Sequence, residues 1–467
     1  MEKYFIDLEN IDTVKYIKIA QHIKKLIDDN LIEDGEKLPS IRSLSKFLNV
    51  NNVTIVNAYK KLENEGYAIQ KIGSGTYAKR KEVAVNFKKK YGEIVRKISS
   101  EEIKMYMDFS GEAACSDVFP ISSFKDVINK VLDRDGIEAL AYQEALGYEG
   151  LRRSIDDFFW NKKIGKDNIL IVSGAQQGID IVSKALINVN DNVVVEKPTY
   201  GGALAVFKWR RANIYEIEVD EDGMDLDKLE KLVKKNKIRC VYVMSYFQNP
   251  TGVSYSIEKK RRLLNMAEIY DFYIIEDDYL SELIYNDNKY ISFKSIDYND
   301  RVIYIKSFSK IFLPGIRLGY MIAPKAFKES IQNSKVNTDI ATSSLMQRAL
   351  DLYIKEGMWK EHIDILNKVY KDRYMFMKER LNDLNEYIEF YSPGGGLHFY
   401  VKLKGTKVNS VDLFYKCKRK GVLITPGIIF YKDPKDGLNY FRVGFSQVGE
   451  EEIDKGINII KDILKKY

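Results

Sequence analysis

Apolar residues in the first 80 positions follow helical spacing and then strand spacing. Between residues 14 and 31 they recur every three or four positions, which predicts a first helix. A second helix is expected to start at Ser40, whose hydroxyl suits an N-cap, and a third to run from Val53 to a stop at Gly66. Residues 67–78 contain two short strand-like runs around a glycine-rich turn. Three helices and a small hairpin predict a winged helix-turn-helix.

From about residue 107 the pattern changes to apolar strands that alternate with helical runs. The expected strands cover residues 169–172, 192–195, 240–244, 272–275 and 302–305. This alternation is typical of an α/β fold with a mainly parallel sheet and helices on both faces. A smaller α+β lobe is expected beyond residue 325, with strands at 394–403 and 440–445.

The chain is therefore expected to contain three folded parts and a linker. We assign residues 1–80 to the winged helix-turn-helix, 81–106 to the linker, 107–325 to a large domain and 326–467 to a small C-terminal domain. The linker is rich in lysine, and residues 91–99 within it are compatible with a helix. The plain interpretation of its basic run is a solvated tether.

Composition limits the class of protein. A chain of 467 residues is long enough for several domains with a large core. It has no run of 18 apolar residues, so no membrane span is expected, and its first residues lack the apolar stretch of a secretory signal. The cysteines, Cys115, Cys240 and Cys417, are scattered and form no C-x-x-C pair, and the three histidines are equally dispersed. We therefore expect a cytoplasmic protein without a metal site.

The charge balance is only mildly basic. The net charge is +7, of which residues 1–81 contribute +3 from 14 basic and 11 acidic side chains. A balance this mild does not by itself predict binding to nucleic acid. Any case for DNA binding must therefore come from motifs.

The most informative local pattern is S-x-S-K-x-x-x-P-G-x-R-x-G, which runs from Ser307 to Gly319. Lys310 offers the amine that a carbonyl cofactor needs for a Schiff base. Ser307, Ser309 and Arg317 offer hydroxyl donors and a permanent cation, which suit a phosphate group. The competing interpretation is a surface lysine beside a loop, since short motifs also match by chance.

This pattern resembles the lysine loop of the aspartate-aminotransferase superfamily, the fold-type I enzymes that carry pyridoxal 5'-phosphate (PLP). The resemblance implies that Lys310 holds PLP as a Schiff base. Gly174, Ala175 and Gln176 resemble the phosphate cup of that superfamily, and small residues at a helix N-terminus suit a phosphate. Tyr200 stands where the superfamily places an aromatic ring against the pyridine, although a packed loop tyrosine is an equal alternative.

Later residues complete the implied PLP site in the order of the superfamily. Asn249, in the N-P-T-G motif of residues 249–252, would donate to the phenolic O3' of PLP, and Tyr279 would bond the same oxygen. An acid must face the pyridine nitrogen to keep it protonated. By resemblance this acid is Asp277, with Asp278 the less favoured choice.

Two further residues concern the ligand and a second subunit. Tyr142 resembles the tyrosine that reaches the phosphate in the partner subunit, which implies a homodimer with shared sites. Arg442 matches the arginine that grips an amino-acid carboxylate, a task that suits a bidentate guanidinium. The plain interpretation of Arg442 is a surface arginine at a strand edge.

The first 80 residues resemble the winged helix-turn-helix of GntR regulators. Residues 38–44 read L-P-S-x-R-x-L, residues 54–59 match the recognition helix, and residues 73–77 match the wing. The resemblance implies that the third helix enters the major groove, while the second helix and the wing meet phosphates. The implied DNA-binding residues are Ser40, Arg42, Asn51, Asn52, Thr54, Asn57, Tyr59 and Gly75.

One pair of residues departs from the GntR pattern. Where the family usually has Ser-Arg before the recognition helix, this chain has Asn51 and Asn52. Asparagine can bond adenine, but a charge is lost. Base preference and affinity are therefore open.

A GntR head on an aminotransferase-like body is the arrangement of MocR/GabR-type transcription regulators. The resemblance implies a head that binds double-stranded operator DNA and a body that senses an amino acid or amine by aldimine exchange at Lys310. Two alternatives remain: a working aminotransferase with an appended domain, and a DNA-binding protein whose body only dimerises. Catalytic turnover would identify the first, and a Schiff-base absorbance band would dismiss the second.

Overall fold

The structure is a computed structural model of the chain. It describes residues 1–8, 14–29, 31–71, 73–79, 88, 91–92, 105–112, 118–142, 144–286, 291–405 and 408–466. Most of the expected linker helix, residues 93–99, and Cys115 lie outside the described residues.

Neither a membrane-spanning helix nor a metal-binding cluster is present among the described residues. No helix there is long and apolar enough to cross a membrane. No three His, Cys, Asp or Glu side chains of that part of the chain stand together in a way that could hold a metal ion.

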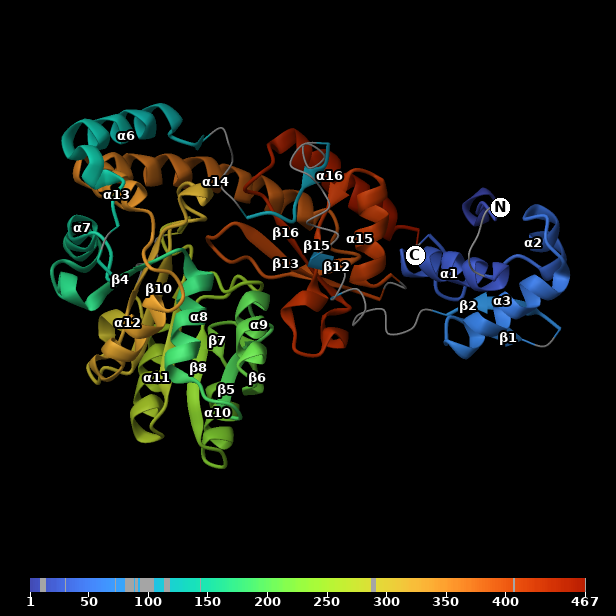
Figure 1. Ribbon diagram of the computed structural model, residues 1–467, viewed down its shortest axis with the longest axis horizontal. Helices are drawn as coiled ribbons and strands as arrows, with labels where there is room; N and C mark the ends of the chain where they lie inside the picture. Colours follow the sequence, from blue (N-terminus) through green and yellow to red (C-terminus); the bar gives the residue numbers. More distant parts are fainter. Residues whose placement is uncertain are drawn as a thin grey trace. The chain divides into compact units, whose positions relative to one another are not determined.

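The chain divides into two compact units, Met1–Ser99 and Ser100–Tyr467. The first unit is a winged helix-turn-helix, drawn in blue in Figure 1. The three helices and the antiparallel hairpin are those that the sequence pattern predicts. Its elements are η1 (Glu2–Tyr4), α1 (Lys15–Asp28), α2 (Ile41–Phe47), α3 (Asn52–Asn64), β1 (Ala68–Lys71) and β2 (Gly75–Ala78).

Apolar side chains from all three helices of the head meet in one core. Ile23 of α1, Leu44 of α2 and Ile55 of α3 are buried in it. The second helix begins as predicted, because the Ser40 Oγ accepts a hydrogen bond from the backbone N–H of Ser43 at 3.1 Å. This cap satisfies one of the N–H groups that a helix leaves unpaired at its start.

The second unit is built on an eight-stranded sheet of order β4-β11-β10-β9-β8-β5-β6-β7. The neighbours from β10 to β6 are parallel, whereas β11 and β7 run antiparallel to their neighbours. The five predicted strands are therefore confirmed. The strands are β4 (Ile169–Val172), β5 (Asn192–Lys197), β6 (Asn213–Asp220), β7 (Gly223–Met224), β8 (Ile238–Val243), β9 (Tyr273–Asp278), β10 (Val302–Ser307) and β11 (Gly319–Ile322).

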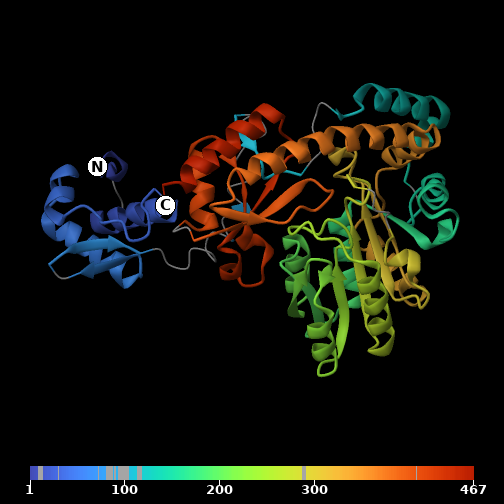
Figure 2. The ribbon, with the colours of Figure 1, turned by 180° about the vertical axis from the view of Figure 1, so that it is seen from behind.

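Helices cover both faces of this sheet (Figures 1 and 2). Right-handed crossovers place α8 and α9 on one face and α10 and α11 on the other, because the chain reverses its direction across the sheet after β6. The helices of this part are α6 (Ile121–Asp135), α7 (Glu149–Trp160), α8 (Ala175–Leu186), α9 (Gly201–Trp209), α10 (Leu226–Val233), α11 (Ile257–Ile269), α12 (Lys328–Val336) and α13 (Ser344–Lys355).

A smaller lobe contains an antiparallel sheet of order β12-β13-β16-β15. Helix α16 packs against both α14 and α15. A short strand from the start of this unit, β3 (Met107–Asp108), pairs in parallel with β14 (Val422–Leu423). Residues 107–108 thus lie with the smaller lobe, whereas the sequence assignment places them in the large domain. The lobe contains β12 (Ile388–Phe390), β13 (His398–Leu403), β15 (Thr425–Pro426), β16 (Tyr440–Gly444), α14 (Met358–Asn382), α15 (Ser410–Arg419) and α16 (Glu450–Leu464).

Candidate functional site

A cavity of about 270 Å³ lies beyond the carboxyl ends of the parallel strands. Loops that leave β5, β8, β9 and β10 supply its walls, which is the usual place for a ligand in an open α/β sheet. The structure brings most of the predicted cofactor residues together here. The cavity is lined by Glu112, Ala175, Gln176, Tyr200, Met244, Asn249, Asp277, Tyr279, Ser307, Ser309, Lys310, Pro314 and Arg317.

One end of the cavity presents groups suited to a phosphate. Gly174 precedes the first turn of α8, whose N–H groups have no partner within the helix. Arg317 donates to the Ser309 Oγ at 3.3 Å and to the Ser173 carbonyl at 2.9 Å. A Cβ at position 174 would lie 3.0 Å from Arg317 Nη2, so glycine keeps this cradle open.

The last glycine of the lysine loop is explained by close packing. Gly319 lies on β11 opposite Ser307 of β10. A Cβ at position 319 would lie 2.5 Å from the Lys306 carbonyl oxygen and 3.2 Å from the Cα of Gly174. A side chain here would therefore force the lysine loop away from the phosphate cradle.

Asp277 faces the cavity from the end of β9 and is 2% exposed. Its Oδ2 accepts a hydrogen bond from the Tyr242 hydroxyl at 2.6 Å, whereas Oδ1 has no partner among the described residues. Burial raises the pKa of Asp277 to about 7, although the bond from Tyr242 opposes this shift. A buried acid with one unpaired oxygen is suited to a protonated pyridine nitrogen.

Asp278 has a different environment. Its carboxylate accepts hydrogen bonds from the Tyr304 hydroxyl at 2.7 Å, from Lys306 Nζ at 3.0 Å and from the Ser281 hydroxyl at 2.8 Å. It does not line the cavity. These contacts support the choice of Asp277 over Asp278 as the acid that faces the cofactor.

Lys310 lines the same cavity as Asp277. Burial lowers the pKa of its ammonium group, with Glu112 opposing the shift and Arg442 and Arg317 adding to it. A larger neutral fraction makes the amine a better nucleophile toward a carbonyl group.

Three further residues predicted to contact the cofactor, Tyr200, Asn249 and Tyr279, already form hydrogen bonds within the protein. Tyr200 donates to Gln176 Oε1 at 3.2 Å, and Tyr279 donates to the Phe247 carbonyl at 2.8 Å. Asn249 also lines the cavity. The roles of these residues toward a cofactor stay predictions.

Arg442, predicted to grip a ligand carboxylate, is paired inside the protein. Its Nη1 lies 2.8 Å from Glu112 Oε2 and donates to Asn249 Oδ1 at 2.8 Å, while Nη2 donates to the Ser110 carbonyl at 2.9 Å. Glu112 Oε1 lies 2.6 Å from His398 Nδ1. The sequence gives no signal for Glu112 or His398, because each stands alone in its segment and the two are brought together only by the fold.

Tyr142 does not line the cavity of this chain and is 82% exposed. That Tyr142 contacts the cofactor phosphate in the partner subunit stays a prediction.

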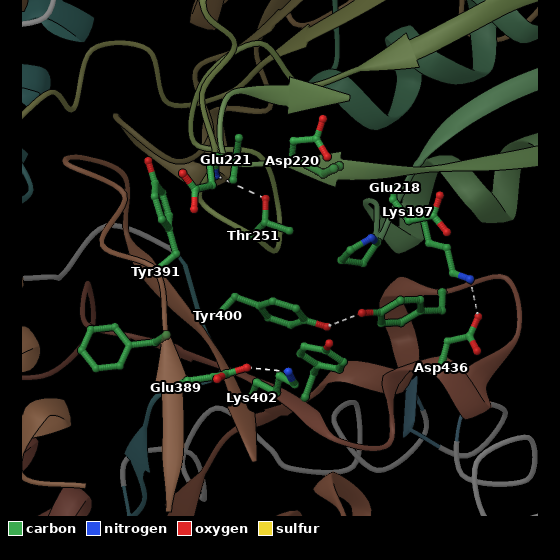
Figure 3. A pocket seen from close by; sticks show the side chains of 16 residues that line it. Lys197, Glu218, Asp220, Glu221, Thr251, Glu389, Tyr391, Tyr400, Lys402 and Asp436 are labelled. Atoms are coloured by element: carbon green, nitrogen blue, oxygen red, sulfur yellow. Dashed lines mark hydrogen bonds and ion pairs between the residues drawn. The ribbon is translucent and has the colours of Figure 1, made fainter. Parts of the chain in front are cut away.

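A second, wider cleft of about 860 Å³ contains none of the predicted site residues (Figure 3). Its two lysines are each paired with an acid, Lys197 with Asp436 at 2.8 Å and Lys402 with Glu389 at 2.5 Å. The other charged residues that line it are acids. This cleft is therefore a poor match for a phosphate group.

In the head, Arg42 and Asn57 are exposed on α2 and α3, and Thr54 is half-buried. Gly75 is exposed in the wing with a φ of 122°, and a Cβ there would lie 2.9 Å from Lys37 Cε. These positions are open to a partner, and their contacts with DNA stay predictions.

Asn51 and Asn52 stabilise the turn between α2 and α3. Asn51 Oδ1 caps α3 by accepting from the Thr54 backbone N–H at 3.0 Å. Asn52, one residue before the expected helix start at Val53, is the first residue of α3, and its Oδ1 accepts from the Ser45 hydroxyl of α2 at 2.6 Å. The pair that replaces Ser-Arg therefore has a structural role whatever bases it contacts.

The prediction for Tyr59 is corrected by the structure. This side chain is 1% exposed, and its hydroxyl donates to the Pro39 carbonyl at 2.7 Å. It fixes α3 against the segment before α2 and has no surface to offer to DNA.

The sequence profile of the aminotransferase class I and II family matches residues 115–460. The chain belongs to the aminotransferase class I and II family. An aromatic-amino-acid aminotransferase of Thermococcus litoralis is 31% identical to this family member over 386 residues, 81% of this chain and 92% of the relative. A kynurenine aminotransferase of Pyrococcus horikoshii, whose crystal structure contains PMP, is similar in fold with a TM-score of 0.75. It is 30% identical and covers 81% of this chain and 94% of its own.

The head of this chain, residues 15–78, matches the gntR family of bacterial regulatory proteins. The uncharacterised HTH-type transcriptional regulator YcxD of Bacillus subtilis is 28% identical over 458 residues, 96% of this chain and 100% of the relative. The chain therefore has the organisation of a MocR/GabR-type DNA-binding transcription regulator.

PLP is the cofactor of the class I and II aminotransferase family, and the residues of the cavity fit it. The unpaired Asp277 Oδ1 offers an acceptor for a pyridine N–H. The cradle at Gly174 and Arg317 suits a phosphate, and Lys310 lines the same cavity.

Proposed function

We propose that the chain is a PLP-dependent transcription regulator. As a homodimer it binds double-stranded operator DNA through its heads and responds to an amino acid or amine at the PLP site. The observation that carries this proposal is the full-length match to HTH-type regulators. The cavity that holds both Lys310 and Asp277 supports a sensing role, because a scaffold that only dimerised would not need these residues.

Different residues of the chain would bind different parts of PLP. When bound, PLP supplies an aldehyde that condenses with amines and a ring that withdraws electrons. Lys310 would hold the cofactor covalently, and Asp277 would keep a proton on its ring nitrogen. Arg317, Ser309 and the first turn of α8 would hold its phosphate.

A ligand can control the head only if it binds one arrangement of the protein better than another. With PLP bound, a ligand amine that took the place of the Lys310 amine would release Lys310 as a free amine, and the β10 loop would no longer be tied to the cofactor. The loop and the lobes around it then change their preferred arrangement, and the dimer carries this change to the DNA-binding heads.

The proposal is tested by fluorescence anisotropy with DNA from upstream of the gene, at a stated salt concentration. The PLP-loaded full chain should bind this DNA but not a scrambled fragment, and a panel of amino acids and primary amines should contain a ligand that changes the affinity. Lys310→Ala should bind the DNA and lose the response to that ligand, while the exposed control Lys325→Ala should keep both. A ligand response that survives in Lys310→Ala contradicts the proposal.

A second candidate is a working aminotransferase with an appended head. The 31% identity to an aromatic-amino-acid aminotransferase favours it. Multiple turnover of amino-acid and keto-acid pairs, without specific DNA binding, would support this alternative.

A further inference from the structure

The guanidinium of Arg442 is already committed to groups of its own chain. The carboxylate of Glu112, the side-chain oxygen of Asn249 and the Ser110 carbonyl all lie within 2.9 Å of its Nη atoms. Arg442 and Glu112 are each only 6% exposed. Removing one partner from such a pair leaves the other as an uncompensated buried charge, which is strongly unfavourable.

Glu112 is held at several points. Its Oε2 accepts from Arg442 and, at 3.2 Å, from Asn249 Nδ2, while its Oε1 lies 2.6 Å from His398 Nδ1. His398 in turn is fixed by its Nε2, which lies 2.9 Å from the Pro250 carbonyl and donates to it. Glu112 therefore occupies the place where a ligand carboxylate would have to sit in order to reach Arg442.

The cavity exposes Glu112 and not Arg442. Glu112 lines the cavity together with Lys310, whereas Arg442 does not. Among the lining residues of the described chain the only cations are Lys310 and Arg317. The proposed function assigns Arg317 to the cofactor phosphate. Lys310 is released when a ligand amine takes its place, but burial lowers the pKa of its ammonium group, so the freed amine is a poor counter-ion for a ligand carboxylate.

We propose that Glu112 restricts the ligand to primary amines that lack a carboxylate next to the amino group. This inference rests on the proposed function and narrows its ligand class. A carboxylate on the ligand would meet the like charge of Glu112 and lose its hydration without gaining a counter-ion. An alkyl, aryl or second amino group meets no such penalty.

The first test compares matched ligands by calorimetric titration of the PLP-loaded full chain. The probes are 2-phenylethylamine with L-phenylalanine, and 1,5-diaminopentane with L-lysine, because each pair differs only by the carboxylate. We expect the amine to bind at least tenfold more tightly in both pairs. Equal affinity, or tighter binding of the amino acid in either pair, overturns the proposal.

Variants then test the role of Glu112 itself. Glu112→Gln removes the charge that neutralises Arg442, so the ratio of the two dissociation constants should move at least tenfold toward the amino acid. Glu112→Asp keeps the charge and should keep the preference for amines. Glu218→Gln, in the wider cleft, should leave the ratio unchanged. An unchanged ratio in Glu112→Gln overturns the assignment.

The two proposals fail in different ways. PLP uptake is measured by absorbance and DNA binding by anisotropy in the same samples. If the wild-type chain shows no specific DNA binding, the proposed role as a transcription regulator is contradicted. A chain that holds PLP, binds its DNA and binds none of the four probes would overturn the ligand class alone. The wild-type comparison stands even if a variant does not fold.

Discussion

Glu196, near the carboxyl end of β5, is fully buried. Its carboxyl group accepts hydrogen bonds from the Tyr255 hydroxyl at 2.8 Å and from Gln248 Nε2 at 3.1 Å. Burial raises the pKa of Glu196 to about 8, although these bonds oppose the shift. The group is therefore protonated in the folded protein at neutral pH, whereas it is ionised in the unfolded chain.

This difference makes stability depend on pH. Between the unfolded pKa and about pH 8 the folded state binds the extra proton, so the free energy of unfolding falls as pH rises. Glu196→Gln, which imitates the protonated acid, should remove a slope of up to about 1.4 kcal/mol per pH unit. Urea unfolding between pH 5 and 7.5, followed by tryptophan fluorescence, measures it. The same slope in wild type and variant would show that Glu196 does not titrate as described.

Single residues of the site were predictable where a motif fixes their chemistry. Lys310 and Asp277 stand in patterns whose spacing the cofactor imposes, and both line the cavity. Glu112 and His398 could not be predicted, because their contact depends on tertiary packing between distant segments. Tyr59 was misjudged for the related reason that burial is not visible in a motif.

At the scale of elements, the contact between β10 and β11 sets the geometry of the lysine loop. Gly319→Ala would place a methyl group against the Lys306 carbonyl and the phosphate cradle at Gly174. We expect PLP affinity to fall at least tenfold, because the strands must separate while the buried sheet persists. Equilibrium dialysis against PLP measures the affinity, and circular dichroism checks the fold. Gly315→Ala, where a Cβ meets nothing within 4 Å, is the matched control and should bind PLP normally.

Strands of the large sheet were predicted where they are buried as a continuous apolar run. The eight-residue β6, most of whose side chains are exposed or half-buried, was not predicted. The five buried strands of four to six residues appear in the sequence as apolar runs. Strands β3, β7, β14 and β15 have two residues each, too few to show an alternation, and they exist because neighbouring segments supply their partners. Local pattern thus predicts the buried strands, while the two-residue strands depend on the assembled fold.

At the scale of the whole molecule, an exposed apolar segment after α6 bears on the predicted homodimer. Ile137, Leu140 and Tyr142 are 76%, 64% and 82% exposed. Leu140→Glu would place a charge in an interface formed there, so it should shift the chain from dimer to monomer. Sedimentation velocity measures the change. Tyr298→Glu, at a position that is 91% exposed elsewhere in the body, should leave the assembly intact. A Leu140→Glu variant that remains dimeric would place the interface elsewhere.

The pairing of β3 with β14 also has a mechanical consequence. The chain that leaves the head enters the body at β3, and only three residues, no more than about 15 Å of chain, separate Asp108 from Glu112. Ser110, between them, is itself bonded to Arg442. The segment that follows β3 is therefore bonded to Arg442 within a few residues of the point where the chain enters the body. A ligand that disturbs the bonds of Arg442 would thus act directly on residues 108–112, the stretch of the body that follows its first strand.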